Sequence, residues 1–213
     1  MRFIIFDMDG VLVDTCRCHA RAYDDLWDRC GVTGPAYEDI TGRPTLEVVR
    51  EFTRSLAPSA NALAEWVRFK QQQARRYLQS ETVIYEDVAP SLAALHRDGI
   101  GMSVATGSSR ETAEVLLERA GIAHYFRFVL TAEDTSRGKP HPEIYLRAVE
   151  LSEVASEEVM VVEDSASGLE AAVAAEIPVA CIRSGLRMAS PLFLGSFPGL
   201  VDLTRAIGVE VVA

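Results

Sequence analysis

The stretch RFIIFDMDGVLVD at residues 2–14 decides the fold of this chain. Its first part, residues 2–6, is aromatic and β-branched and predicts a short buried strand. Two carboxylates, Asp7 and Asp9, follow directly, at the strand end where open α/β sheets bind ligands. Their mutual repulsion costs free energy unless a cation offsets it, and a divalent metal with oxygen ligands would do so. A polar turn that merely leaves a strand is the alternative interpretation.

Length and composition are those of an ordinary globular protein. The 213 residues suffice for a full core, and the formal net charge of −10 argues against nucleic acid or an anionic membrane as a partner. No uninterrupted apolar run approaches the ~20 residues of a membrane-spanning helix. The apolar stretch near the N-terminus is too short for a secretory signal, which favours the cytoplasm.

Four cysteines, Cys16, Cys18, Cys30 and Cys181, are spread along the chain. The first two lie two residues apart in an expected helix, where such neighbours do not face each other. Without a Cys-x-x-Cys spacing, we expect reduced thiols rather than a disulfide or a metal site.

Strand-like and helical patterns alternate along most of the chain. The strand-like runs occupy residues 2–6, 101–105, 127–131, 159–163 and 177–182. Helical spacing follows at 88–98, at 109–120 (with Ser108 or Ser109 as N-cap) and from 167 onward. This alternation predicts an α/β fold: a doubly wound, mostly parallel, Rossmann-like sheet with helices on both faces.

Residues 15–81 interrupt that alternation. They contain three helical patterns, at 15–30, 45–56 and 60–79, and no convincing strand. We therefore expect a core formed by residues 1–14 and 82–213, with an inserted α-helical unit at 15–81.

Four motifs occur in a characteristic order. They are DMDGVL at 7–12, GMSVATGS at 101–108, GKPHP at 138–142 and VVEDSASG at 161–168. Together they resemble the motifs of the haloacid dehalogenase superfamily, most of whose members are phosphatases. The similarity covers essentially the whole chain. The insertion at 15–81 matches the subtype with an α-helical cap, in the branch that includes β-phosphoglucomutase and phosphoglycolate phosphatase.

The resemblance assigns catalytic roles to the first motif. Asp7 would be the nucleophile that forms an aspartyl phosphate, splitting one difficult step into two. Asp9 would protonate the leaving oxygen and then activate water as a base. Dehalogenases of the superfamily lack an aspartate at this second position because a halide needs no proton, so Asp9 favours a phosphatase.

The fourth motif implies a Mg²⁺ site. In the family, the aspartate of this motif is the more direct ligand, which ranks Asp164 above Glu163. Asp7 and the backbone carbonyl of Asp9 would complete the site, since Mg²⁺ prefers oxygen ligands and retains waters. A solvated acidic turn is the alternative.

The second and third motifs imply a phosphate cradle. Thr106 would offer its hydroxyl, and Gly107 and Ser108 backbone N–H groups at a helix start. Lys139, between Gly138 and Pro140, would direct its ammonium group at the phosphate. Taken singly, an ordinary N-cap and a solvated lysine explain these residues equally well.

Several residues are candidates for contact with the rest of the substrate. His19 follows the catalytic loop at a spacing that matches a histidine of β-phosphoglucomutase-like proteins. Gly42, Arg43 and Thr45 belong to a loop before a helix, and Arg110 lies early in the helix after Thr106. For each of them, a structural or solvated role is an equally good account.

Two departures from the family pattern bear on hinge and activity. YEDV at 85–88 replaces the Pro-Gly turn usual after the cap, so the second hinge is expected to differ. Thr45 stands at the position of an arginine expected of a sugar phosphomutase, and only Arg75 and Arg76 lie near the position of its lysine. This favours hydrolysis over mutase activity.

We therefore expect a Mg²⁺-dependent phosphatase, monomeric or weakly dimeric, that acts on a small phosphorylated metabolite. The candidates are a sugar phosphate, a nucleoside monophosphate or a phosphoglycolate-like compound. A β-phosphoglucomutase-type phosphotransferase is the alternative enzyme. A non-catalytic receiver-type switch is the third possibility, but there the phosphorylated aspartate lies on a middle strand and no helical unit is inserted.

Overall fold

The computed structural model describes residues 1–40, 43, 45–81 and 83–211. The chain divides into two compact units. One consists of Met1–Asp14 and Val83–Ala213, and the other of Thr15–Thr82. We call them the sheet unit and the helical unit. That the helical unit serves as a cap for a site on the sheet unit stays a prediction.

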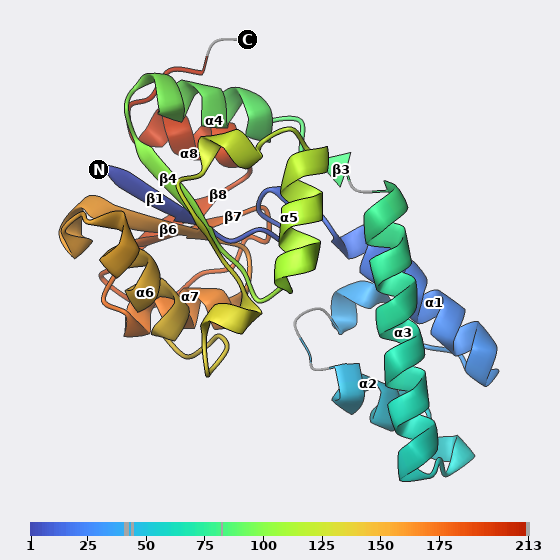
Figure 1. Ribbon diagram of the computed structural model, residues 1–213. Helices are drawn as coiled ribbons and strands as arrows, with labels where there is room; N and C mark the ends of the chain where they lie inside the picture. Colours follow the sequence, from blue (N-terminus) through green and yellow to red (C-terminus); the bar gives the residue numbers. More distant parts are fainter. Residues whose placement is uncertain (41–42, 44, 82, 212–213) are drawn as a thin grey trace. The chain divides into compact units, whose positions relative to one another are not determined.

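Six parallel strands form the sheet, in the order β5-β4-β1-β6-β7-β8 (Figure 1). They are β1 (Phe3–Phe6), β4 (Gly101–Ala105), β5 (Val129–Leu130), β6 (Val159–Glu163), β7 (Val179–Ile182) and β8 (Phe193–Phe197). Every residue of β1, β4, β6 and β7 is buried, as expected for parallel strands covered on both faces. The predicted doubly wound α/β fold is confirmed.

Helices cover both faces of this sheet. They are α4 (Val88–Arg97), α5 (Arg110–Arg119), α6 (Glu143–Ser152), α7 (Ala166–Ala174) and α8 (Leu200–Ala206). Figure 1 shows α4 and α8 together on one face, and α6 and α7 together on the other. Of the two N-cap candidates, Ser109 caps α5 by accepting a hydrogen bond from the backbone N–H of Thr112.

Parts of the sheet unit go beyond the sequence prediction. The elements α6, β8 and α8 were not assigned, and β5 is shorter than the predicted run at 127–131. The strand β8 is an edge strand in which half-buried and exposed residues alternate, so it lacks the continuous apolar run of the inner strands. A short antiparallel pair, β2 (Val13–Asp14) with β3 (Val83–Ile84), joins the two connections to the helical unit.

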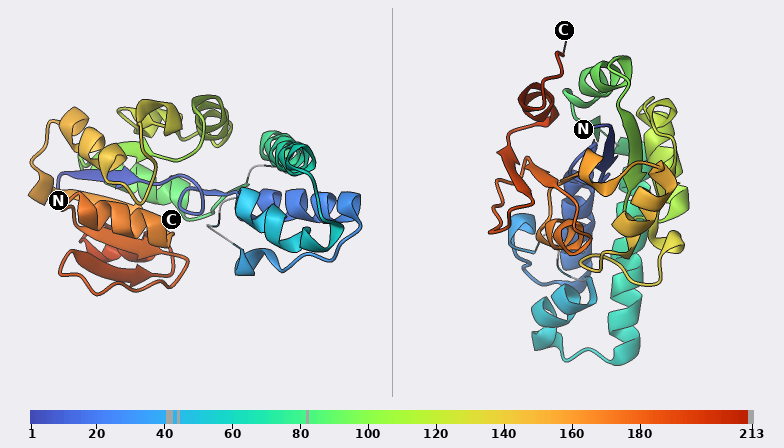
Figure 2. Two further views of the ribbon diagram at one scale, coloured as in Figure 1. Left: turned by 90° about the horizontal axis from the view of Figure 1, so that it is seen from below. Right: turned by 90° about the vertical axis from the view of Figure 1, so that its left-hand side faces the viewer.

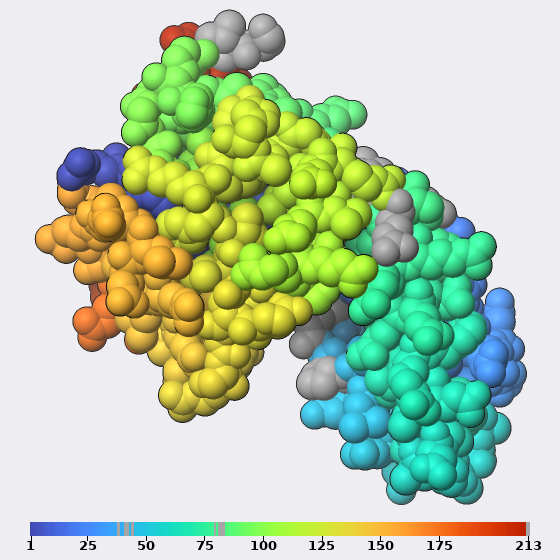
Figure 3. All heavy atoms as spheres, in the orientation of Figure 1, coloured from blue at the N-terminus to red at the C-terminus, as the bar shows by residue number. Residues whose placement is uncertain are grey.

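The helical unit contains α1 (Cys16–Cys30), α2 (Thr45–Phe52) and α3 (Ala60–Glu81). Figures 1 and 2 show α1 alongside α3, and the atoms of α3 form a continuous face of this unit in Figure 3. The prediction of one helix over 45–56 is wrong at its end. The helix α2 stops at Phe52, and the Thr53 hydroxyl donates to the carbonyl of Val49 at 2.6 Å.

Short 3-10 turns complete the described elements, at Tyr37–Asp39, Arg54–Leu56, Ala123–Tyr125, Ala132–Asp134 and Ser156–Glu158. All four cysteines are free thiols. Within the described ranges, no helix is both long enough and apolar enough to cross a membrane.

Candidate active site

Three neighbouring strands place acidic and hydroxyl residues at one edge of the sheet. In the register of β1 with its neighbours, Phe6 lies opposite Val104 of β4 and Val162 of β6. The residues that end or follow these strands therefore lie side by side, at the edge where α/β sheets bind ligands. The Asp7 N–H donates to the carbonyl of Val162 at 2.9 Å, which holds the start of the loop against β6.

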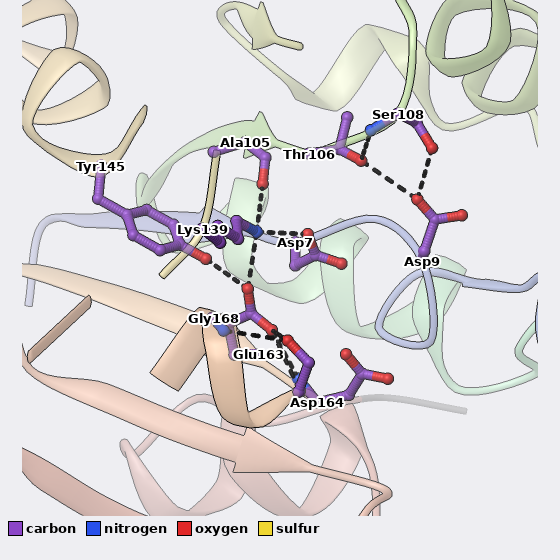
Figure 4. A network of polar contacts seen from close by, with 11 residues as sticks. Asp7, Asp9, Ala105, Thr106, Ser108, Lys139, Tyr145, Glu163, Asp164 and Gly168 are labelled. Atoms are coloured by element: carbon purple, nitrogen blue, oxygen red, sulfur yellow. Dashed lines mark hydrogen bonds and ion pairs between the residues drawn. The ribbon is translucent and has the colours of Figure 1, made fainter. Parts of the chain in front are cut away.

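Lys139 ties these three strands together. Its Nζ lies 2.6 Å from Asp7 Oδ1, 2.7 Å from Glu163 Oε1 and 3.0 Å from the Ala105 carbonyl oxygen (Figure 4). Burial alone would lower the pKa of Lys139, but the two carboxylates outweigh this and raise the pKa well above its usual range. The lysine is therefore charged, and its charge is shared between two acids.

Glu163 is fully buried and uses both of its carboxylate oxygens. Oε1 accepts from Lys139 and from the Tyr145 hydroxyl at 2.6 Å, and Oε2 accepts from the N–H groups of Asp164 and Ser165 and from the Ser165 hydroxyl. Burial would raise the pKa of Glu163, but Lys139 and these donors hold it below its ordinary value. A Cβ at Gly168 would overlap this carboxylate, so the glycine leaves room for Glu163 beside the first turn of α7.

Asp7, Glu163 and Asp164 form a candidate metal centre, with one carboxylate oxygen from each within 4.8 Å of the others. Burial, followed by the charges of Glu163 and Asp9, raises the pKa of Asp164 to about 7. Burial also raises the pKa of Asp7 well above its ordinary value, although Lys139 opposes it. Such a surplus of shielded negative charge is what a divalent cation with oxygen ligands offsets, so the residues fit Mg²⁺.

The groups in this centre differ in their freedom to bind a metal. Glu163 is saturated by hydrogen bonds, whereas Asp164 accepts none from a described side chain. Gly10, at φ 77, leaves the space that the Asp164 carboxylate occupies. This arrangement favours Asp164 over Glu163 as a direct ligand, as predicted, but the ligand role of each residue stays a prediction.

Without a metal, protein stability is expected to fall as pH rises from about 4 to 7. With its pKa raised to about 7, folded Asp164 keeps a proton that it loses near pH 4 when unfolded. Between these values the folded state binds more protons, so stability decreases with rising pH, and the raised pKa of Asp7 acts in the same direction.

Thermal unfolding in EDTA across this range measures the effect. Mg²⁺ at about 100 times its Kd should add ~2.7 kcal/mol at pH 8 and much less at pH 5. The Asp164→Asn variant is the matched control and should show a smaller decrease in stability, because only the contribution of Asp7 remains. A midpoint temperature of unfolding that rises between pH 5 and 7 in EDTA contradicts the prediction.

Asp9 is held by the side chains of two residues predicted to bind phosphate, Thr106 and Ser108. Its Oδ2 accepts from the Ser108 hydroxyl at 2.8 Å and from the Thr106 hydroxyl at 3.2 Å (Figure 4). The Ser108 N–H donates to the Thr106 oxygen, whereas Gly107 is exposed. Asp9 Oδ1 is buried without a hydrogen-bond partner among the described residues. Because buried carboxylate oxygens are normally paired, this one has an unused acceptor for a ligand.

The predicted substrate residues of the helical unit have neighbours of their own. Arg43 is paired with Glu51. Burial raises the pKa of Tyr23, and the nearby side chain of Thr45 acts in the opposite direction. Gly42 lies outside the described residues. Substrate contact by these residues stays a prediction.

Arg110, at the start of α5, also has acidic neighbours. Its guanidinium pairs with Asp134 and with Glu114 one turn along the helix. Both contacts are partly exposed and of the kind that contributes little to stability. A role in substrate binding would require the guanidinium to exchange these partners, and it also stays a prediction.

His19 has a neighbour that the sequence analysis overlooked. Its Nδ1 lies 3.0 Å from Nζ of Lys70, which is only 5% exposed and stacks over the ring of Tyr23. Burial lowers the pKa of Lys70 to about 8. The signal was present: Lys70 comes three residues after Val67 and four before Ala74, in phase with the buried stripe of α3. The helical unit therefore places a lysine beside His19, and this weakens the sequence-based argument against a mutase.

A family model described as haloacid dehalogenase-like hydrolase matches residues 4–182, most of the chain. The chain belongs to this family. Among its relatives, a phosphorylated carbohydrates phosphatase of Thermotoga maritima is 31% identical over 179 residues, covering 83% of this chain and 82% of the relative. A phosphoglycolate phosphatase of Pseudomonas fluorescens is 26% identical and covers 97% of this chain and 78% of the relative.

A solved structure is also similar over the full length. It is a Thermotoga maritima protein provisionally assigned as a β-phosphoglucomutase, with a TM-score of 0.78, 27% identity, and coverage of 97% of this chain and 98% of the other. Hydrolases of this family generally use Mg²⁺. The predicted family and the predicted enzyme class, a phosphoric monoester hydrolase, are thus confirmed.

Proposed function

We propose that this protein is a Mg²⁺-dependent phosphatase of small phosphorylated metabolites that works through an aspartyl phosphate on Asp7. One observation carries the proposal. The Asp7 carboxylate is buried at the end of β1, bound by Lys139, and followed two residues later by a second carboxylate with an unpaired oxygen. A nucleophile, a fixed cation and a group for proton transfer are what phosphoryl transfer from a monoester requires.

The reaction has two balanced steps. An oxygen of Asp7 attacks phosphorus, the bond from phosphorus to the ester oxygen breaks, and Asp9 gives its proton to the leaving alcohol. Water then attacks phosphorus, Asp9 takes a proton from it, and the bond from phosphorus to the Asp7 oxygen breaks, so that inorganic phosphate leaves and Asp7 is restored. Asp9 is thus returned to its protonated form, which suits a group that acts first as acid and then as base.

Positive charge must balance the negative charge of the incoming phosphate and of the carboxylates. Two unit charges ~4 Å apart repel by about 4 kcal/mol at an effective dielectric of 20. Lys139 supplies one positive charge at Asp7. Asp7 and Asp164 would hold the Mg²⁺, with the backbone carbonyl of Asp9 as a further oxygen, and the bound ion would supply additional charge neutralisation. The Thr106 and Ser108 hydroxyls would then turn from Asp9 to the phosphate.

The names of two relatives support a substrate class. One of them is named for phosphorylated carbohydrates and another for phosphoglycolate, and both cover most of this chain. We propose a sugar phosphate or a phosphoglycolate-like acid, with a nucleoside monophosphate as a further candidate.

Intramolecular phosphotransfer of the β-phosphoglucomutase type is the second candidate. The likeness to the Thermotoga maritima structure and the presence of Lys70 beside His19 favour it. It uses the same Asp7 and Asp9 but must protect the aspartyl phosphate from water.

Phosphate release from a panel of monoesters tests the proposal. Glucose 6-phosphate, β-glucose 1-phosphate, ribose 5-phosphate, AMP and phosphoglycolate are incubated with Mg²⁺ or with EDTA. We expect metal-dependent release that is fastest for one compound class. An isomerised sugar phosphate with little free phosphate would support the mutase. A folded, Mg²⁺-binding protein that produces neither contradicts both enzymatic proposals.

A further inference from the structure

Arg183 adopts an unusual backbone conformation at the end of β7. Its backbone angle φ is 66°, in the left-handed region that residues other than glycine rarely occupy. Such conformations persist where the surroundings hold them in place, and they cluster at functional positions. The Arg183 side chain is only 18% exposed and bonds two groups of the sheet unit, and its guanidinium carbon lies over an aromatic ring.

The first group belongs to the loop that carries Asp9. Arg183 Nε and Nη2 lie 3.4 and 3.3 Å from the carbonyl oxygen of Val11, two residues after Asp9. Within this loop, the Gly10 N–H donates to the Val13 carbonyl at 2.9 Å. The loop after Asp9 is therefore held both by its own backbone hydrogen bond and by the guanidinium of Arg183.

The other two contacts are in the connection that returns from the helical unit. Arg183 Nη2 lies 2.7 Å from Asp87 Oδ1, and its Cζ lies 3.7 Å from the centre of the Tyr85 ring. Asp87 Oδ2 in turn accepts from the Leu200 N–H at 2.6 Å, at the first residue of α8. A Cβ on Gly199 would lie 2.5 Å from this oxygen, so the glycine permits the close approach. These contacts give Tyr85 and Asp87 of the YEDV segment a structural role in the sheet unit.

We propose that Arg183, together with Asp87 and Tyr85, forms a clamp that positions Asp9 for proton transfer. The inference rests on the proposed function. A guanidinium suits this task because its planar fork bonds two acceptors while its face stacks on a ring, which an ammonium group cannot do. Arg183 is a positioning residue, since it acts through the backbone of Val11. Displacement of a catalytic group by about 1 Å can cost ~10²-fold in rate.

Two substrates with different leaving groups test this role. One is the alkyl monoester that the wild type hydrolyses fastest, and the other is p-nitrophenyl phosphate, whose phenolate leaves without a proton. In Arg183→Ala, kcat/KM should fall by ~10²-fold for the alkyl ester and by less than about tenfold for the aryl ester. Arg183→Lys should recover part of the loss. Equal losses on both substrates, or no loss, would overturn the proposal.

Controls separate this role from general stability. Arg2→Ala removes an exposed ion pair with Glu158 and should leave kcat/KM unchanged for both substrates. If Arg183→Ala does not fold, Asp87→Asn, which retains an oxygen for the Leu200 N–H, should show the same selective loss in weaker form.

Hydrogen exchange distinguishes failure of the clamp from failure of the proposed function. In Arg183→Ala, or in Asp87→Asn if that variant replaces it, the amides of Leu12 and Val13 should exchange at least tenfold faster than in wild type. Unchanged exchange would overturn the clamp even in an active phosphatase. Faster exchange in a protein that releases no phosphate would leave the clamp in place as a structural device and overturn its role at Asp9.

Discussion

Replacing Asp7 with asparagine is expected to lower kcat by more than ~10⁴-fold, because the amide cannot form the phosphoryl–enzyme bond. The substitution keeps the shape of the side chain, and Lys139 keeps Glu163 as an ionic partner. The fold should therefore survive, while Mg²⁺ binds more weakly because one carboxylate is lost. Phosphate release and calorimetric Mg²⁺ binding measure the two effects.

Asp98→Asn is the matched control. Asp98 is a partly exposed carboxylate of the sheet unit whose pairing with Arg97 is a surface contact. Its loss should leave kcat within about twofold, as expected for surface substitutions. An Asp7→Asn protein that retains most of its activity excludes the aspartyl-phosphate mechanism.

Replacing Lys139 with methionine is expected to destabilise the protein by about 3–5 kcal/mol and to abolish activity. Lys139 is 11% exposed and pairs with both Asp7 and the fully buried Glu163. Removing it leaves two adjacent shielded carboxylates without a compensating charge, which costs more than the pair itself contributes. Urea unfolding at neutral pH measures the loss.

The double variant Lys139→Met/Glu163→Gln tests the reason for this effect. Neutralising Glu163 removes one of the two uncompensated charges, so the double variant should be more stable than Lys139→Met alone. It should nevertheless remain inactive, because Asp7 still lacks its cation. If Lys139→Met loses less than about 1 kcal/mol, the ion pairs are weaker than the geometry indicates.

The strands at the centre of the sheet could be predicted from local pattern. Short apolar runs that end in polar residues, such as FIIF before Asp7 and VMVV before Glu163, belong to strands buried on both faces. The edge strand β8 could not be assigned this way, because one side of it faces solvent and its residues alternate in burial. The end of α2 could not be predicted from local pattern either, because the helical periodicity continues beyond Phe52. A single side-chain hydrogen bond from Thr53 accompanies the end of this helix.

The candidate site was predicted as a set of residues but not as a set of contacts. Contact of Lys139 with the phosphate stays a prediction, and its bond to Asp7, 132 residues away, was not foreseen. Likewise, Thr106 and Ser108 hydrogen-bond Asp9. Which acid pairs with which donor depends on distances between strand ends, and these exist only once the strands are in register.

Local chemistry was thus sufficient for the α/β class, the family and the acidic residues at the strand ends, because apolar runs and motif spacing are properties of short segments. Other contacts could be seen only in the tertiary structure. They are the hydrogen bonds that saturate Glu163, the pairing of Lys70 with His19, and the bonds of Arg183 to Val11 and Asp87. Except for the bonds of Glu163 to its chain neighbours Asp164 and Ser165, these contacts join residues at least 18 positions apart. Burial in the folded chain makes an unpaired charge costly enough to require a partner.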